Sequence, residues 1–232
     1  MKNIDIKNLD WPDISLNLDK EGYVLLPSLL NAEQIEILSA HVQSSQSHSD
    51  ALSLEALKLG RGERRTWPGG LPDAFVDLPQ ILYDQLAPIA SRWNEIMGLD
   101  AAYTLDYVQY RDGVSSLKWR AAVTSHNLGT GDFQTLHQDD GVDGLFPIQL
   151  LILLSDPVDD FIGGEFVMVE QRPRMQSRPI VLPLRKGDAA LICAAQRPFK
   201  GTKGFYRVNM KHAISRVNSG TRISVELQFA AR

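Results

Sequence analysis

The segment Thr221–Phe229, TRISVELQF, alternates polar and apolar side chains without interruption. In a strand, residues two apart point to the same face, so the polar residues would share one face and the apolar residues the other. The polar row consists of Arg222, Ser224, Glu226 and Gln228. The apolar row suits a packed layer, which predicts a strand whose polar face lines the inside of a barrel.

Similar short runs precede this segment from about residue 101 and are separated by turn residues. The runs are YTLDYVQY, KWRAAVTSHN, FQTLHQD, FPIQLLILLS, GEFVMVEQ, PIVLPL, DAALICAA and GFYRVNMKHAIS. The turns include LGTG at 128–131, GG at 163–164, KGD at 186–188 and NSG at 218–220. Many short strands at this spacing are typical of a β-sandwich or barrel. The NSG turn also predicts that the last two strands form a hairpin.

The N-terminal third has helical patterns instead. Asn31 is a good N-cap with Gln34 three residues later, and apolar residues follow at helical spacing. A second helix is predicted over residues 78–97, and the run GRGERRTWPGG at 60–70 predicts a loop that could serve as a lid. We therefore expect one domain over residues 1–232, mainly β with N-terminal helices. Residues 1–100 would form a helical support region and residues 101–232 the barrel core.

Composition limits the function classes. The chain has 232 residues, of which 44% are hydrophobic and 22% charged, as in globular proteins. Its formal net charge of -4 gives no sign of the broad basic face that nucleic-acid-binding proteins use. The single cysteine excludes an internal disulfide. No signal-peptide pattern and no long apolar run is visible, so we expect a cytoplasmic protein without a membrane span.

Two histidines and an aspartate form a candidate metal site. His137 and Asp139 stand two residues apart in FQTLHQD, so both side chains can project from one face of a strand. His212 follows in another strand-like run. Two imidazoles and one carboxylate with open coordination positions are the facial triad of non-haem Fe(II) oxygenases. Arg222 and Ser224 follow shortly after and would suit a carboxylate ligand, because guanidinium pairs with carboxylate through two parallel hydrogen bonds.

Several blocks of the last 130 or so residues resemble those of 2-oxoglutarate- and Fe(II)-dependent oxygenases. The resemblance is closest to a prokaryotic subfamily often labelled as oxygenases acting on damaged DNA, by analogy with AlkB-type dealkylases. The blocks lie at 131–139, 146–149, 163–167, 170–178 and 204–209, and the run EQRPRMQSR at 170–178 is the most distinctive. The resemblance implies a double-stranded β-helix, or jelly roll, with Fe(II) on His137, Asp139 and His212. It implies 2-oxoglutarate on Arg222, aided by Ser224, and no catalytic side chain beyond the metal centre.

The chain also departs from the subfamily pattern. Asn127 and Leu128 replace an Arg-Tyr pair, whose tyrosine contacts 2-oxoglutarate in AlkB-type enzymes, so that contact is absent here. Glu226 stands where glycine is usual, and Ala230-Ala231 replace a terminal His-Asp-type motif. A buried, unpaired carboxylate at Glu226 would be costly, so we expect it to have a partner, either a protein arginine or a cationic group of the substrate.

Together these features favour an oxygenase that hydroxylates a C–H bond of a small polar molecule, such as an amino acid or biosynthetic intermediate, with O2 and with release of succinate and CO2. The alternatives are an oxidative dealkylase of damaged nucleobases and a non-catalytic jelly-roll binding protein. Candidate substrate-binding residues are Trp67, Arg120, His126, Asn127 and Glu226. Candidate phosphate contacts, or else internal ion pairs, are Arg61, Arg64, Arg65, Arg172, Arg174 and Arg178. His41, in a helix, and His48, in a polar loop, are expected to face solvent.

Overall fold

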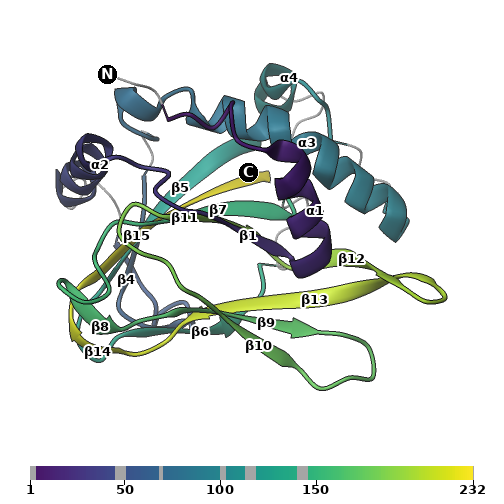
Figure 1. Ribbon diagram of the computed structural model, residues 1–232. Helices are drawn as coiled ribbons and strands as arrows, with labels where there is room; N and C mark the ends of the chain where they lie inside the picture. The colour runs from purple at the N-terminus through teal and green to yellow at the C-terminus, as the bar shows by residue number, and fades with distance from the viewer. Residues whose placement is uncertain are drawn as a thin grey trace.

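The computed structural model describes residues 4–44, 51–67, 70–99, 103–112, 119–139 and 146–231. Two antiparallel sheets stack face to face, and the helices cover the outer side of one of them (Figure 1). The helices are α1 (Trp11–Glu21), α2 (Ala32–Ser44), α3 (Leu78–Met97) and α4 (Tyr107–Asp112), with a 3-10 turn, η2, at Asp73–Phe75. This is the predicted mainly β architecture with N-terminal helices.

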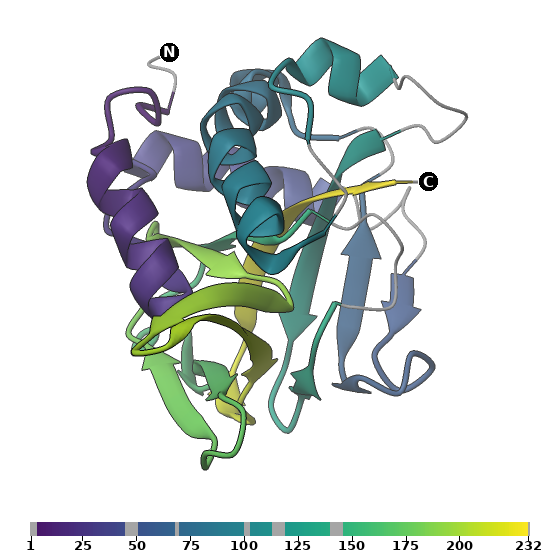
Figure 2. The same ribbon diagram turned by 90° about the vertical axis from the view of Figure 1, so that its right-hand side faces the viewer.

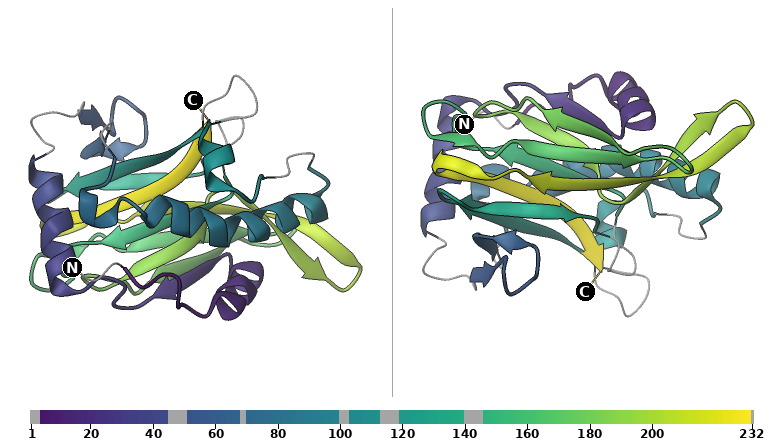
Figure 3. Two further views of the ribbon diagram at one scale, coloured as in Figure 1. Left: turned by 90° about the horizontal axis from the view of Figure 1, so that it is seen from above. Right: turned by 90° about the horizontal axis from the view of Figure 1, so that it is seen from below.

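The larger sheet has seven strands within the described residues, in the order β1-β11-β7-β15-β5-β4-β2. Their bounds are β1 (Tyr23–Leu26), β11 (Ala189–Cys193), β7 (Ile148–Leu153), β15 (Arg222–Ala231), β5 (Trp119–Leu128), β4 (Glu63–Thr66) and β2 (Ala51–Ser53). The helices lie on this sheet when the molecule is seen from above, and α3 runs across it (Figure 3, left). The apolar residues of β15 face the helices, because Phe229 contacts the ring of Tyr83 on α3. The polar residues of β15 therefore face the other sheet, as predicted.

The smaller sheet has the order β10-β9-β13-β6-β3, and β12 pairs with the first half of β13. The bounds are β10 (Arg178–Leu182), β9 (Phe166–Gln171), β13 (Gly204–Ile214), β6 (Phe133–His137), β3 (Gly60–Arg61) and β12 (Gln196–Gly201). Two short strands, β8 (Phe161–Gly163) and β14 (Val217–Gly220), pair separately. Seen from below, the strands of this sheet face outward without helices over them (Figure 3, right). The barrel interior is thus the layer between the two sheets.

The two predicted helices of the N-terminal third are confirmed. α3 has the expected bounds of 78–97, and α2 begins directly after Asn31. The Asn31 side chain accepts a hydrogen bond from the Gln34 N–H at 2.9 Å, and the Gln34 side chain accepts one from the Asn31 N–H at 3.0 Å. This reciprocal capping box satisfies backbone donors at the helix start that would otherwise have no partner.

Replacing Asn31 by alanine should lower the free energy of unfolding by about 1 kcal/mol, because the cap hydrogen bond to the Gln34 N–H is lost. Urea denaturation followed by circular dichroism would measure the change. Asn31→Asp is the matched control, since aspartate caps a helix about as well as asparagine. An alanine variant as stable as the wild type would show that the cap contributes nothing.

Residues 1–100 are not purely helical, contrary to expectation. β1 joins the larger sheet through β11, and the predicted loop at 60–70 contains β3 and β4, which extend the two sheets. The sharp corner between these strands occurs at Gly62, which has φ +120° and whose added Cβ would lie 2.5 Å from the Leu128 side chain. The charged, glycine-rich sequence does not reveal these strands, because β3 pairs with β6 and β4 pairs with β5, each more than fifty residues away in the sequence.

Two other expectations are wrong. The run at 103–110 does not form a strand, because Asp106 caps the N–H groups of Val108 and Gln109 and starts α4. The last two long strands do not form a hairpin, since β13 belongs to the smaller sheet and β15 to the larger one. The intervening NSG segment forms β14, which pairs with β8 and carries the chain between the sheets.

His41 is half-buried and not solvated, because its ring packs against Trp67 with centroids 4.6 Å apart. His48 lies outside the described residues. No helix among the described residues is long and apolar enough to cross a membrane.

Candidate active site

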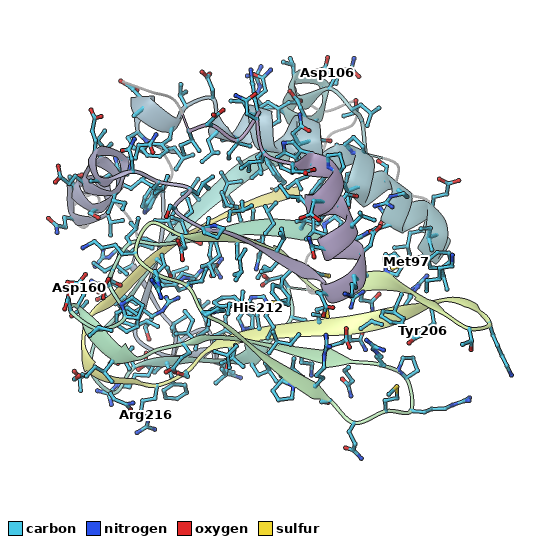
Figure 4. The ribbon with its side chains drawn as sticks, viewed as in Figure 1. Met97, Asp106, Asp160, Tyr206, His212 and Arg216 are labelled. Carbon is cyan, nitrogen blue, oxygen red and sulfur yellow. The ribbon has the colours of Figure 1, made fainter. Side chains whose placement is uncertain are left out.

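The three predicted metal ligands meet between the two sheets. His137 ends β6 and stands opposite His212 of β13 in the antiparallel register, and Asp139 follows β6 directly. The register shifts between His212 and Ile214, and such a bulge can re-aim neighbouring side chains. The two imidazole rings contact edge to face with centroids 4.3 Å apart. Figure 4 shows His212 in the layer between the sheets.

The donor atoms of these residues fit one metal ion. One ligand atom from each of His137, Asp139 and His212 lies within 4.8 Å of the others. An Asp139 oxygen lies 3.9 Å from His137 Nε2, and the other lies 3.6 Å from His212 Nε2. Both separations exceed a hydrogen bond, yet they suit atoms that share an ion at about 2.1 Å from each. His137 Nδ1 binds the Thr135 carbonyl at 2.8 Å, which leaves Nε2 for a ligand.

The charge state of the site also suits metal binding. Burial and the nearby His137 lower the pKa of His212 below its ordinary value, so its imidazole is neutral at pH 7. His212 is 1% exposed, whereas the side chains of His137 and Asp139 are 11% and 24% exposed. The site is therefore open to solvent on the side of His137 and Asp139 and closed behind His212.

Two glutamines support the candidate ligands. Gln228, from the inward row of β15, donates a hydrogen bond to an Asp139 oxygen at 3.0 Å and is 2.7 Å from Gln149 Oε1. Gln149 of β7 lies 3.5 Å from His212 Nε2. Sequence reasoning placed Gln228 in the inward row without assigning it a role and gave no role to Gln149. A signal for Gln149 was available, because it is the single polar residue in the strand IQLLIL.

Arg222 and Ser224, the pair predicted to bind a carboxylate, hydrogen-bond to each other inside the barrel. The Arg222 guanidinium donates a hydrogen bond from Nη1 to Ser224 Oγ at 2.7 Å, and both residues are essentially inaccessible to solvent. Burial lowers the pKa of Arg222 to about 10, so the side chain remains charged at pH 7. Its Nε has no hydrogen-bond partner among the described residues. A buried cation with a free donor is suited to a carboxylate such as that of 2-oxoglutarate.

Leu128, which replaces the tyrosine that contacts 2-oxoglutarate in AlkB-type enzymes, lies beside Arg222. It pairs with Arg222 in the register and therefore lies on the same inward face of the sheet. It is completely buried. An aliphatic side chain here cannot donate a hydrogen bond, so a carboxylate at Arg222 would have to find its donors on other residues, of which Arg222 and Ser224 are the predicted ones.

His126 and Glu226 continue the polar interior. His126 pairs with Ser224 in the register, and its Nδ1 lies 3.6 Å from Glu226 Oε1. Both ring nitrogens of His126 and Glu226 Oε1 are buried without a hydrogen-bond partner among the described residues. Among the described residues, the arginine partner expected for Glu226 is therefore not found as a hydrogen bond: His126 is a neighbour at 3.6 Å, and Glu226 interacts with Arg222 only through charge. Burial, together with the charges of Arg64 and Arg222, lowers the pKa of His126 well below its ordinary value, so this neighbour is neutral.

Other sequence-predicted substrate residues lie elsewhere. Trp67 is buried on the helix side of the larger sheet, where its Nε1 donates to Ser125 Oγ at 3.1 Å, so it belongs to the core. Asn127 pairs with Ile223 and shares that outer face. The side chain of Arg120 lies outside the described residues, so its role stays a prediction.

Most of the candidate phosphate-binding arginines form internal ion pairs. The pairs are Arg61–Asp132, Arg65–Glu63, Arg172–Glu170 and Arg178–Glu21. No ion pair within the described residues involves Arg64 or Arg174. The internal-pair alternative therefore holds for four of the six arginines.

Known proteins match both the sequence and the fold. Residues 62–231 match the model of the Oxygenase-NA family, described as "Oxygenase, catalysing oxidative methylation of damaged DNA". An uncharacterised protein of Mycobacterium tuberculosis (strain H37Rv) is 36% identical over 169 residues, which is 70% of each chain. The counterpart in strain CDC 1551 is equally similar.

Solved structures share the fold at low sequence identity. A prolyl-4-hydroxylase from Pseudomonas putida has a TM-score of 0.59 at 13% identity, covering 96% of this chain and 99% of that one. A 2-oxoglutarate–Fe(II) oxygenase family protein from Burkholderia pseudomallei has a TM-score of 0.54 at 14% identity, covering 96% and 91%. The double-stranded β-helix prediction is thereby confirmed. This chain belongs to the Oxygenase-NA family of oxygenases, and it combines the fold of 2-oxoglutarate–Fe(II) oxygenases with a His-Asp-His cluster that could hold a metal ion.

Proposed function

We propose that this oxygenase hydroxylates an unactivated C–H bond of a small polar molecule. His137, Asp139 and His212 would hold Fe(II), and Arg222 with Ser224 would hold the distal carboxylate of 2-oxoglutarate. The supporting observation is the buried, unpartnered polar surface of His126 and Glu226 on the interior face between these two groups of residues. Because unpartnered polar atoms in a protein interior are costly, this surface favours a ligand that can hydrogen-bond to it.

When bound at these residues, iron and 2-oxoglutarate would supply the oxidation by O2, with one oxygen atom entering the substrate and the other entering succinate as CO2 leaves. The chain's own residues orient and enclose the reactants. Gln228 holds the Asp139 carboxylate, Thr135 fixes the His137 ring and Ser224 holds the Arg222 guanidinium. No acid or base from the protein is needed beyond these positioning contacts.

A turnover assay with Fe(II), 2-oxoglutarate and pools of polar metabolites would test this function. We expect at least one pool to stimulate succinate formation, and mass spectrometry to find a product heavier by one oxygen atom. Succinate formation that no pool stimulates would contradict the small-molecule proposal. Heat-treated protein is the control for reaction of free iron with 2-oxoglutarate.

Oxidative dealkylation of damaged nucleobases is the second candidate, because the family model's description refers to damaged DNA. Four of the six candidate phosphate-contacting arginines are paired with carboxylates, which weakens this candidate. It predicts formaldehyde release from methylated oligonucleotides and binding that weakens steeply with salt. Oligonucleotide binding that does not change with salt concentration, together with no formaldehyde release, would rule out the dealkylase candidate.

We also infer that residues 1–232 act as a single domain. Strands from residues 23–66 pair into the same two sheets as strands from residues 119–231. Within the described residues, this strand pairing joins the N-terminal segment to both sheets, so we do not expect a separate helical region.

Replacing Arg222 by methionine should raise the KM for 2-oxoglutarate about 10- to 100-fold, because a hydrogen-bonded charge pair is lost at a buried position. Steady-state kinetics at varied 2-oxoglutarate would measure this. Arg216→Met is the matched control, since Arg216 is exposed on the lower outer surface in Figure 4. An unchanged KM in the Arg222 variant would exclude Arg222 as the carboxylate anchor.

A further inference from the structure

Arg64 differs from the other arginines of its segment because it faces the barrel interior. It pairs with His126 in the register of β4 and β5, and His126 in turn pairs with Ser224 of β15. Directly paired residues of antiparallel strands project from the same face, so Arg64 shares the inward face with His126 and Ser224. Arg64 is half-buried, and no carboxylate among the described residues forms an ion pair with it. The neighbouring Arg65 points to the opposite face and pairs with Glu63.

Three kinds of polar group therefore adjoin one another inside the barrel. Arg64 supplies a cation, the neutral His126 supplies one donor and one acceptor, and Glu226 supplies an acceptor. His126 is completely buried and Glu226 is 7% exposed, yet neither His126 ring nitrogen nor Glu226 Oε1 has a partner in the described part of the chain. A well-packed interior without a ligand would not leave these atoms unsatisfied.

The strand order separates Arg64 from the cosubstrate anchor. β5 lies between β15 and β4, so His126 has Arg222 on one side and Arg64 on the other. Arg222 is already hydrogen-bonded to Ser224, which fits the 2-oxoglutarate carboxylate. The opposite side, with Arg64, remains for a different anion. Figure 2 shows β4 and β2, in blue, at one edge of the larger sheet.

We propose that Arg64, His126 and Glu226 form a substrate subsite for a zwitterionic small molecule of the amino-acid type. Arg64 binds the substrate carboxylate, Glu226 accepts hydrogen bonds from its ammonium group, and His126 completes the hydrogen bonding between them. The inference rests on the proposed function, since it names the substrate class of the same site. A cation and an anion on either side of a neutral group are complementary to a zwitterion and to neither a simple anion nor a simple cation.

Calorimetric titration of protein loaded with Mn(II) and 2-oxoglutarate would test the subsite without turnover. The probes are free α-, β- and γ-amino acids, their N-acetyl and carboxamide derivatives, and nucleoside 5′-monophosphates. We expect at least one free amino acid to bind the wild-type protein, whereas its N-acetyl and carboxamide derivatives bind at least about tenfold more weakly. Binding by a nucleoside monophosphate and by no amino acid would overturn the proposal.

Variants locate the effect within the subsite. Arg64→Gln should weaken amino-acid binding about 10- to 100-fold and leave 2-oxoglutarate binding unchanged, and Glu226→Gln should weaken amino-acid binding similarly. Arg65→Gln, which removes the same charge from the other face of β4, should leave both affinities unchanged. If Arg64→Gln weakens 2-oxoglutarate binding instead, Arg64 belongs to the cosubstrate site and the proposal is wrong.

The result also separates this inference from the proposed function. Failure of the wild-type protein to bind Mn(II) and 2-oxoglutarate would contradict the assigned iron and cosubstrate residues. Normal binding of both, with no free amino acid binding, would overturn only the zwitterion subsite.

Discussion

Asp139→Ala should lose 2-oxoglutarate turnover and bind Fe(II) more than about 100-fold more weakly than the wild type. Losing a group that merely supports a ligand already reduces metal affinity about 10- to 100-fold, and loss of a ligand itself should exceed that. Asp139 contributes the only negative charge among the three clustered residues, and its oxygens lie 3.9 and 3.6 Å from the two imidazoles. Without it, two imidazoles and no carboxylate would face the dication.

Gln228→Ala provides the matched comparison. It removes the hydrogen bond to the Asp139 oxygen while all three ligands remain, so its metal affinity should fall between those of the wild type and Asp139→Ala. Calorimetric titration with Mn(II) under anaerobic conditions would measure all three proteins. Equal affinities for the wild type and Asp139→Ala would mean that the cluster does not hold the metal.

The site was largely predictable from sequence because its residues follow simple strand periodicity. His137 and Asp139 are two residues apart, and the alternation of Thr221–Phe229 placed Arg222, Ser224 and Glu226 on one face. A period of two depends only on local backbone geometry, so it could be recognised without knowing the neighbours of the strand.

The errors occurred where long-range pairing determines the structure. β4 consists of Glu-Arg-Arg-Thr, which has no apolar pattern, and it forms because β5 offers an adjacent edge. The NSG segment has turn composition, yet β8 pairs with it and the chain crosses between sheets there. Trp67 and Asn127 were expected near the substrate because they are close in sequence to charged or site residues. The face of the sheet on which these two side chains lie depends on the strand register, which is known only once the paired strands are known.

The unusual run EQRPRMQSR at 170–178 is also explained by the structure, because it supplies part of a buried charge network. Arg197 is completely buried and hydrogen-bonds to Glu170 and to the carbonyls of Asp19 and Lys20 at the end of α1. Glu170 also accepts from Arg172 at 2.7 Å. Gly22, with φ +79°, caps the C-terminal end of α1, and an added Cβ there would lie 2.7 Å from Arg197 Nε. The network therefore ties β9 and β12 to α1.

Glu170→Ala should lower the free energy of unfolding by about 3–5 kcal/mol, because it leaves the Arg197 charge buried without its carboxylate. Chemical denaturation would measure the loss. Arg178→Ala is the control for a partly exposed pair, and it should cost about 1 kcal/mol or less because its 47% exposed side chain is screened by solvent.

A second variant separates an isolated buried charge from simple loss of packing. Replacing both partners, as Glu170→Leu with Arg197→Met, removes the desolvated charges together, so the double variant should be more stable than Glu170→Ala. Arg197 also bonds to two carbonyls of α1, which lose a donor in the double variant, so recovery should be incomplete. If the double variant is no more stable than Glu170→Ala, the network stabilises the fold through its shape and helix contacts and not through charge pairing.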